Sequence, residues 1–137
     1  MLIDKRIDKN NWCEIKDILP QITEIQSLDL INMSLTEFPK MSHIIINDYF
    51  YCWGNQITRF KNCPKINGNF YCNNNQITSF KDCPIVKESI YCFYNKITSF
   101  KDCPQINGIL YSDFKIFDNV QQYSKEKKRK FLYWKHK

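Results

Sequence analysis

A block of fifteen residues recurs three times in this chain, and its copies start 20 residues apart. The copies occupy residues 50–64, 70–84 and 90–104. A fixed period of this length is typical of a solenoid, in which each unit buries its apolar side only against its neighbours. The repeat therefore predicts a stack of similar coils for the central part of the chain.

Each unit begins with a segment whose apolar residues alternate. In the second unit, Phe70 and Cys72 are apolar, and Tyr71 and Asn73 lie between them. Alternation with a period of two predicts a short strand with one side facing inward. Successive strands would stack in parallel, about 4.8 Å apart, because the repeat leaves room for the crossover that a parallel connection needs.

The return path between strands carries residues that disfavour helix. Every unit ends in a proline, at Pro64, Pro84 and Pro104. Proline lacks the N–H group that a helix interior needs and favours extended geometry, so long helices are not expected here. Asn67-Gly68 and Asn107-Gly108 predict a turn just before the next strand.

One polar residue recurs at a position that turns inward. Asn55, Asn75 and Asn95 each follow the strand cysteine by three residues. A buried amide without partners is costly, so a polar residue held at such a position needs hydrogen bonds. We predict a structural asparagine ladder in which these side chains bond the backbone of neighbouring turns.

Six of the seven cysteines fall into two registers of the repeat, spaced alternately by 11 and 9 residues. These spacings follow from the repeat itself and match no zinc template, and a buried thiol behaves as a small apolar group. We therefore predict two structural cysteine ladders, without disulfides, metal or cofactor. They comprise Cys52, Cys72 and Cys92 in one register and Cys63, Cys83 and Cys103 in the other.

The motif Phe-x-Cys-x-x-Asn-x-Ile, followed by Thr-x-Phe-x-x-Cys-Pro, resembles the leucine-rich repeat pattern Leu-x-Leu-x-x-Asn-x-Leu. The short units resemble those of bacterial effectors, giant viruses of amoebae and large phages. The resemblance covers residues 28–117. It implies a leucine-rich-repeat solenoid with a parallel β-sheet on its concave face, a mostly extended or irregular convex side, and short helical caps at the ends.

Three parts follow along the chain. Residues 1–27 are interpreted as an N-terminal cap, residues 28–119 as a solenoid of about five units, and residues 120–137 as a basic C-terminal cap or tail. Isoleucines spaced by three and four over 15–25 predict an amphipathic helix interrupted at Pro20. Such a helix would cover the open core of the first coil.

The outward side of the predicted strands is rich in aromatic residues. In leucine-rich repeat proteins this side is the concave face and usually the binding surface. Tyrosine and tryptophan are enriched at interface hot spots, which favours partner binding. The alternative is that the rings stabilise the sheet by stacking on one another, and both can hold together. The candidate residues are Tyr49, Tyr51, Trp53, Tyr71, Asn73, Tyr91, Phe93, Tyr111 and Asp113.

The positive charge of the chain is concentrated at its C-terminal end. Residues 121–137 carry a net charge of +6, and residues 1–120 sum to zero. Such a run can bind nucleic acid or an anionic membrane surface, or direct nuclear entry. Apolar residues near helical spacing over 120–134 equally suit a capping helix with a basic outer side. The basic residues of this tail are Lys125, Lys127, Lys128, Arg129 and Lys130.

Several functional classes find no support in the sequence. The chain has only two histidines and no nucleophile elbow, phosphate loop or paired catalytic carboxylates, so we expect no enzyme. No segment approaches the 18 apolar residues of a membrane span. Charges within residues 1–8 are unlike a signal peptide, so we expect an intracellular, cytoplasmic protein, or a nuclear one through the basic tail.

The function predicted from these features is a monomeric scaffold that binds another protein through its aromatic strand face. If the viral resemblance holds, the partner is a host protein. The alternative is an adaptor whose basic tail binds nucleic acid or an anionic membrane while the repeats serve as a platform. A third interpretation is a remnant repeat protein without a specific partner.

Overall fold

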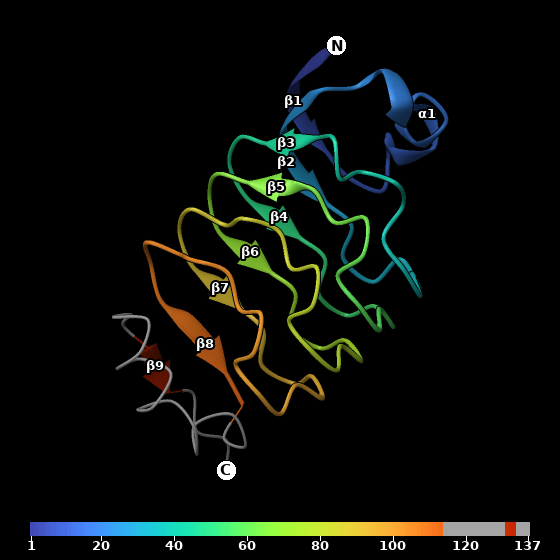
Figure 1. Cartoon of the computed structure of the whole chain (residues 1–137). Helices are drawn as coiled ribbons and strands as arrows, with labels where there is room; N and C mark the ends of the chain where they lie inside the picture. Colours follow the sequence, from blue (N-terminus) through green and yellow to red (C-terminus); the bar gives the residue numbers. More distant parts are fainter. Residues whose placement is uncertain (114–130, 134–137) are drawn as a thin grey trace.

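The computed structural model describes residues 1–113 and the backbone of residues 131–133. It shows a β-solenoid of about five stacked coils in the described residues, with almost no helix (Figure 1). The N-terminal elements are β1 (Leu2–Ile7), α1 (Trp12–Lys16), the 3-10 helix η1 (Leu19–Gln21) and β2 (Glu24–Asp29). The later strands are β3 (Ile45–Ile46), β4 (Phe50–Tyr51), β5 (Lys65–Ile66), β6 (Phe70–Tyr71), β7 (Ile90–Tyr91), β8 (Leu110–Ser112) and β9 (Phe131–Tyr133).

All the strands join one parallel sheet, in the order β5-β3-β2-β4-β6-β7-β8-β9, and β1 also pairs with β2. The register advances by one repeat per strand, so that Phe50 lies opposite Phe70, and Phe70 opposite Ile90. The parallel sheet and the stacked coils predicted from the repeat are therefore confirmed. The row of β2, β4, β6, β7, β8 and β9 is called the main ladder below.

A second row of pairing runs beside the main ladder and was not predicted. The long strand β2 pairs with β3 through Glu24 and Ile25, and with β4 through Leu28 and Asp29. Strand β3 pairs in turn with β5, and an isolated bridge joins Ile66 to Val86. Two of these coils therefore contribute two short strands each, β3 with β4 and β5 with β6, separated by a corner (Figure 1).

The corner between the two segments explains one predicted turn. The Gly68 N–H donates a hydrogen bond of 2.8 Å to the Asp48 carbonyl of the preceding coil. A β-carbon at Gly68 would collide with that same carbonyl, so this close approach requires glycine. The equivalent corner before β7 carries Glu88, which shows that the requirement is local to each coil.

Phenylalanine side chains from successive coils form the centre of the core. The rings of Phe50 and Phe70 stack with centroids 5.5 Å apart, and those of Phe60 and Phe80 with centroids 6.1 Å apart. All four side chains are fully buried. Aromatic pairs in such offset contact add stabilisation beyond the apolar area that they bury.

A tight turn follows the second phenylalanine of each repeat unit. The Cys63 N–H donates to the Phe60 carbonyl at 3.0 Å, and Asn62 between them has a φ of +72°. Asp82 and Asp102 occupy the same left-handed position in the next two units. Asparagine and aspartate tolerate this conformation better than other side chains do, which accounts for the Lys-Asn/Asp-Cys sequence at the turn.

The amphipathic helix predicted over 15–25 is wrong in its extent. Helix α1 ends at Lys16, the 3-10 helix η1 contains Pro20, and Ile25 lies in strand β2. Ile22 and Ile25 are fully buried, but Ile22 directly follows the 3-10 helix η1, and Ile25 lies in β2, which pairs with β1 and β3. The spacing of three between these isoleucines therefore comes from a bend into a strand and not from a helical turn.

The helix interpretation of the C-terminal segment also fails where the structure describes it. Residues 131–133 form strand β9, which pairs in parallel with β8 and places Tyr111 opposite Leu132. This strand continues the main ladder by one rung. The basic residues of the tail, Lys125, Lys127, Lys128, Arg129 and Lys130, lie outside the described residues.

Candidate functional site: the tyrosine face

Tyrosines from successive coils lie on the outward side of the main ladder. Tyr51 pairs in register with Tyr71, Tyr71 with Tyr91, and Tyr91 with Tyr111. Tyr49 precedes β4 by one residue and stacks on Tyr51, with ring centroids 4.2 Å apart. All five side chains are half-buried. These five residues are called the tyrosine face below.

The rings of this face cover one another. Tyr71 and Tyr91 stack with centroids 4.4 Å apart and planes 9° apart, and Tyr91 and Tyr111 with values of 4.3 Å and 6°. Tyr51 meets Tyr71 edge-on, at 4.6 Å and 76°. Both faces of the Tyr91 ring are therefore covered, so its edge and its hydroxyl point outward. The stacking expected as the alternative is present, and partner binding stays a prediction.

The hydroxyls of Tyr51 and Tyr91 stay protonated at neutral pH, because burial raises the pKa of both. Burial, followed by hydrogen bonding to Tyr111, raises the pKa of Tyr91 to about 12. Burial is also the largest cause that raises the pKa of Tyr51. Asn69 donates a hydrogen bond of 3.4 Å from Nδ2 to the Tyr71 hydroxyl. The face thus presents hydroxyl groups that can both donate and accept hydrogen bonds.

The two polar residues predicted beside the tyrosines, Asn73 and Asp113, both make hydrogen bonds within the solenoid. Asn73 donates from Nδ2 to the Asn74 side chain at 2.8 Å. The carboxylate of Asp113 accepts the backbone N–H groups of Tyr94 at 2.7 Å and Asn95 at 3.0 Å. Asp113 is therefore engaged in holding the preceding coil.

The two other aromatic residues that were predicted for the face are both half-buried. One of them contacts an aromatic residue that was not predicted. The two predicted residues are Trp53 and Phe93. Tyr94 contacts Phe93 edge-on, with centroids 5.6 Å apart and planes 75° apart. The Tyr94 side chain is 51% exposed, and its φ is +60°. The sequence could have indicated Tyr94, because the same position of the two preceding repeats carries Gly54 and Asn74.

Charged side chains lie at the N-terminal end of the face. The sequence analysis did not predict them. Asp29 pairs in register with Tyr51 and accepts a hydrogen bond of 2.8 Å from Arg6 of β1. This hydrogen bond is the largest cause that raises the pKa of Arg6. The pair lies at a cavity of about 390 Å³ that Asp8 and Lys9 also line. The first rung of the face is therefore polar and carries both signs of charge.

The asparagines make the hydrogen bonds expected of a ladder. Asn75 donates from Nδ2 to the carbonyls of Cys52 and Cys72, both at 3.1 Å, and its Oδ1 accepts the Ile57 N–H at 3.0 Å. Asn95 repeats this pattern one coil later, with the Cys72 carbonyl as a shared acceptor. Asn55 bonds the edge coil through the N–H groups of Met33 and Leu35 and the carbonyls of Leu30 and Cys52.

The six cysteines of the repeat lie in or against the core of the solenoid. All seven cysteines of the chain lie within the described residues, and none forms a disulfide. Burial raises the pKa of the Cys52, Cys63, Cys72 and Cys92 thiols well above the ordinary value. Cys13, outside the repeat, is exposed. Among the described residues, no group of three or more histidine, cysteine, aspartate or glutamate side chains is placed to hold a metal ion.

Fold and face together define a class, which is a β-solenoid protein with a stacked tyrosine row along its strands. None of the helices within residues 1–113 is long and apolar enough to cross a membrane. Comparisons with protein-family models, with curated proteins and with solved structures find no match for this chain. A function for this protein therefore has to be argued from its own geometry.

Proposed function

We propose that this chain is a non-enzymatic leucine-rich-repeat protein that binds another protein through the tyrosine face. The observation that carries the proposal is the unbroken row of tyrosines from Tyr51 to Tyr111 on the outward side of the sheet. The row spans three strand spacings, about 14 Å at the usual distance between strands. Such a row is enough to contact one strand or one helix of a partner.

The stacking within the face is an advantage for binding. Because Tyr91 is held between Tyr71 and Tyr111, its ring is already ordered before a partner arrives. Association then loses less side-chain entropy than it would with loose surface residues. The ring edges and the hydroxyls offer apolar contact and hydrogen bonds side by side.

The geometry favours a protein over a nucleic acid as the occupant of the face. Single-stranded nucleic acids bind by stacking bases on open aromatic faces and by pairing phosphates with cations. The faces of Tyr91 are covered by its neighbours, and residues 1–120 carry no net charge. This surface therefore offers neither the open aromatic faces nor the excess of cations that nucleic-acid binding requires.

The test is affinity capture from a host lysate with the full chain and two double variants. Tyr71→Ser/Tyr91→Ser removes the rings, and Tyr71→Phe/Tyr91→Phe keeps the rings but removes the hydroxyls. We expect a partner that is captured by the wild-type chain at low and high salt and is lost with the serine variant. The phenylalanine variant separates the contribution of the rings from that of the hydroxyls, since its stacking is retained, and the circular dichroism spectrum of the serine variant checks that its sheet is intact. Equal capture by the serine variant, with a native circular dichroism spectrum, contradicts the proposal.

The concentration of positive charge in residues 121–137 supports a second candidate function. In this proposal the tail binds nucleic acid or an anionic membrane, and the solenoid is a platform. Deletion of residues 125–137 would then abolish capture, and high salt would weaken it. The tyrosine variants would have no effect.

A further inference from the structure

The outward side of the sheet continues beyond the tyrosine face, across β2 and β1 at the N-terminal end of the solenoid (Figure 1). Ile7 of β1 pairs with Leu28 of β2, and both side chains are fully buried. Side chains alternate along a strand, so the next residues, Asp8 and Asp29, lie on the outward side, where both line one cavity. Asp29 pairs in register with Tyr51, so the row of tyrosines continues into two carboxylates at this end.

The cavity at this end of the row has a volume of about 390 Å³. Pockets that bind ligands typically have about 300–1,000 Å³. Its lining includes two cations, Arg6 and Lys9, besides the two carboxylates. The hydrogen bond to Asp29 is the largest cause that raises the pKa of Arg6, and the charge interaction with Tyr49 is the next. The guanidinium of Arg6 therefore lies beside the first ring of the tyrosine face.

The carboxylates of the cavity already have donors. The side chain of Asp29 is only 14% exposed, and its two oxygens accept hydrogen bonds from Arg6 at 2.8 Å and from the Ile31 N–H at 3.2 Å. Asp8 accepts the Asn10 N–H at 2.9 Å through Oδ1. The Oδ2 of Asp8 is 4.0 Å from Nη2 of Arg6, which is beyond hydrogen-bond distance. A cationic ligand would have to compete with these donors.

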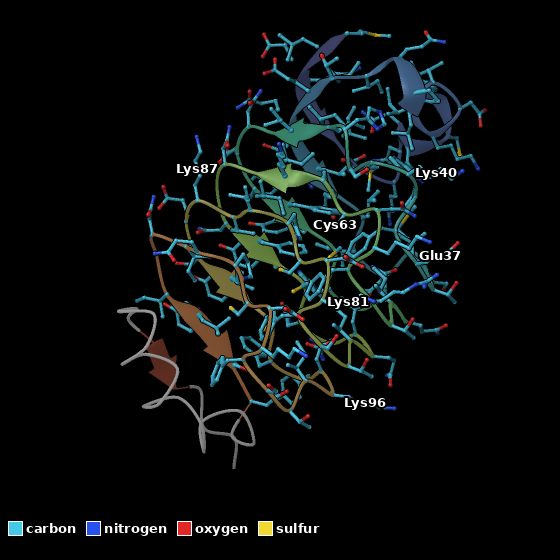
Figure 2. All side chains as sticks on the ribbon, in the orientation of Figure 1. Glu37, Lys40, Cys63, Lys81, Lys87 and Lys96 are labelled. Atoms are coloured by element: carbon cyan, nitrogen blue, oxygen red, sulfur yellow. The ribbon has the colours of Figure 1, made fainter. Side chains whose placement is uncertain are left out.

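The two cations, in contrast, have N–H donors that the described residues do not use. Within residues 1–113 the Arg6 guanidinium makes one hydrogen bond, to Asp29, and 54% of its side chain is exposed. Lys9 is exposed and has no ion-pair partner within the same residues. Cations on the coil loops, such as Lys87 and Lys96, extend outward into solvent (Figure 2). Arg6 differs from them because a largely buried carboxylate orients its planar fork, which matches the two oxygens of a carboxylate.

We propose that the cavity beside Tyr49 receives a carboxylate of the protein segment that binds the tyrosine face, with Arg6 and Lys9 as the groups that bind it. A single negative charge fits better than a phosphate, because Asp8 lines the same cavity and repels further negative charge. The proposal rests on the proposed function, because it names a feature of the partner that the face binds.

The position of the cavity fixes where the carboxylate lies in the bound segment. Strand β1 is five strand spacings from β8, through β2, β4, β6 and β7. This distance is about 24 Å, and an extended segment advances about 3.3 Å per residue. About seven residues therefore span the surface from Tyr111 to Arg6. We expect the acidic group at one end of such a segment and apolar residues over the tyrosine rings.

The probe for the test is a display library of random linear peptides with a free carboxyl terminus, sorted on the full chain. The enriched peptide is synthesised with an N-terminal fluorescein label and titrated by fluorescence anisotropy at low and high salt. Two matched forms carry either an amidated C-terminus or glutamine and asparagine in place of the acidic side chains. Loss of affinity in the first form assigns the terminal carboxylate as the bound group, and loss in the second assigns a side chain.

Two variants of the chain remove donors from the cavity. Arg6→Gln should weaken the labelled peptide about tenfold, as for loss of one hydrogen bond between charged groups. Lys9→Gln should weaken it about threefold at low salt and less at high salt, and it breaks no ion pair within the described residues. Lys5→Gln is the matched control and should leave the affinity unchanged, because Lys5 is an exposed cation of the same strand that does not line the cavity. Urea unfolding checks that Arg6→Gln stays folded without its bond to Asp29.

A third variant tests the sign of the bound charge. Asp8→Asn removes a negative charge 4.0 Å from Nη2 of Arg6 and keeps an oxygen that accepts the Asn10 N–H. A carboxylate should bind this variant about threefold more tightly at low salt, whereas a cation would bind it more weakly. A gain in affinity has the further advantage that a damaged fold does not produce it.

Other results overturn the inference. These are no enrichment, enrichment of basic peptides, a peptide whose affinity does not depend on its carboxylates, or weaker binding to Asp8→Asn. If binding survives Arg6→Gln and Lys9→Gln but is lost in Tyr71→Ser/Tyr91→Ser, the carboxylate site is wrong and the proposed function stands. If the serine variant still captures its partner from lysate, the proposed function itself fails.

Discussion

Replacing Asn75 by alanine tests how the asparagine ladder holds the coils together. The amide is buried and bonds the Ile57 N–H and the carbonyls of Cys52 and Cys72. The two carbonyls keep a second donor after the substitution, because Asn55 also donates to Cys52 and Asn95 also donates to Cys72. The Ile57 N–H would lose its acceptor, the Asn75 side-chain oxygen.

The size of the effect follows from this accounting. One buried N–H without a partner costs about 1–3 kcal/mol, and each weakened carbonyl adds a fraction of one hydrogen bond. We expect Asn75→Ala to lower the free energy of unfolding by about 3 kcal/mol, out of the roughly 5–15 kcal/mol of a typical domain. Asn73→Ala, in the same loop but on the surface, should change it by less than about 0.5 kcal/mol.

The Cys72 carbonyl, which accepts hydrogen bonds from two asparagines, allows a more specific prediction. In Asn75→Ala/Asn95→Ala, the Cys72 carbonyl loses both of its asparagine donors. The double variant should therefore be destabilised by about 1 kcal/mol more than the sum of the single variants. Urea unfolding followed by circular dichroism is measured for the wild-type chain and for Asn73→Ala, Asn75→Ala, Asn95→Ala and the double variant. Hydrogen exchange at the Ile57 amide reports the local loss. Additive changes, or a loss for Asn75→Ala no larger than for Asn73→Ala, would refute the ladder as the source of stability.

Three further predictions follow from burial and protonation. A thiol reagent should label the exposed Cys13 rapidly and leave Cys52 and Cys72 unlabelled in the folded chain, because burial shields these two thiols and raises their pKa. Mass spectrometry of the labelled peptides checks this. Because the pKa of Tyr91 is raised to about 12 in the folded state, its contribution to stability is complete below about pH 10 and is lost as the pH rises toward 12. Unfolding free energy measured against pH should fall more steeply over this window for the wild-type chain than for Tyr91→Phe, and equal slopes would be inconsistent with the shift. Ser112→Cys should raise the unfolding free energy by about 1 kcal/mol, because Ser112 buries a polar hydroxyl in a register that otherwise carries cysteine, and a thiol costs less to bury. A drop in the urea midpoint would count against this.

The repeat predicted the main ladder because its signal is local and redundant. Phe70 and Cys72 alternate with polar residues, and the same alternation returns at a constant interval. The second row of pairing gave no comparable signal, since Lys65–Ile66 is too short for an alternation to be recognised. Its only trace was the apolar register of Ile66 and Val86, both of which are buried.

The ends and the ring geometry could not be predicted for different reasons. Leu2–Ile7 contains three consecutive charged residues, which hide its pairing with β2 from a pattern based on apolar alternation. The spacing of Ile22 and Ile25 fits a helix as well as a bend into a strand, and tertiary pairing decides between them. The outward position of Tyr71 and Tyr91 follows from the strand, but the closure of their rings on one another depends on rotamers set by the neighbouring coil.

The constant register of the main ladder has a consequence for how such a chain can change. Strands β4, β6 and β7 follow one another at an offset of 20 residues, so an in-frame duplication of residues 70–89 would insert one complete coil between existing neighbours. The new coil would add its own tyrosine, its own ladder asparagine and one strand spacing of about 4.8 Å. The length of the tyrosine face can thus be increased or decreased in fixed steps by recombination alone, with the residues before and after the repeats unchanged.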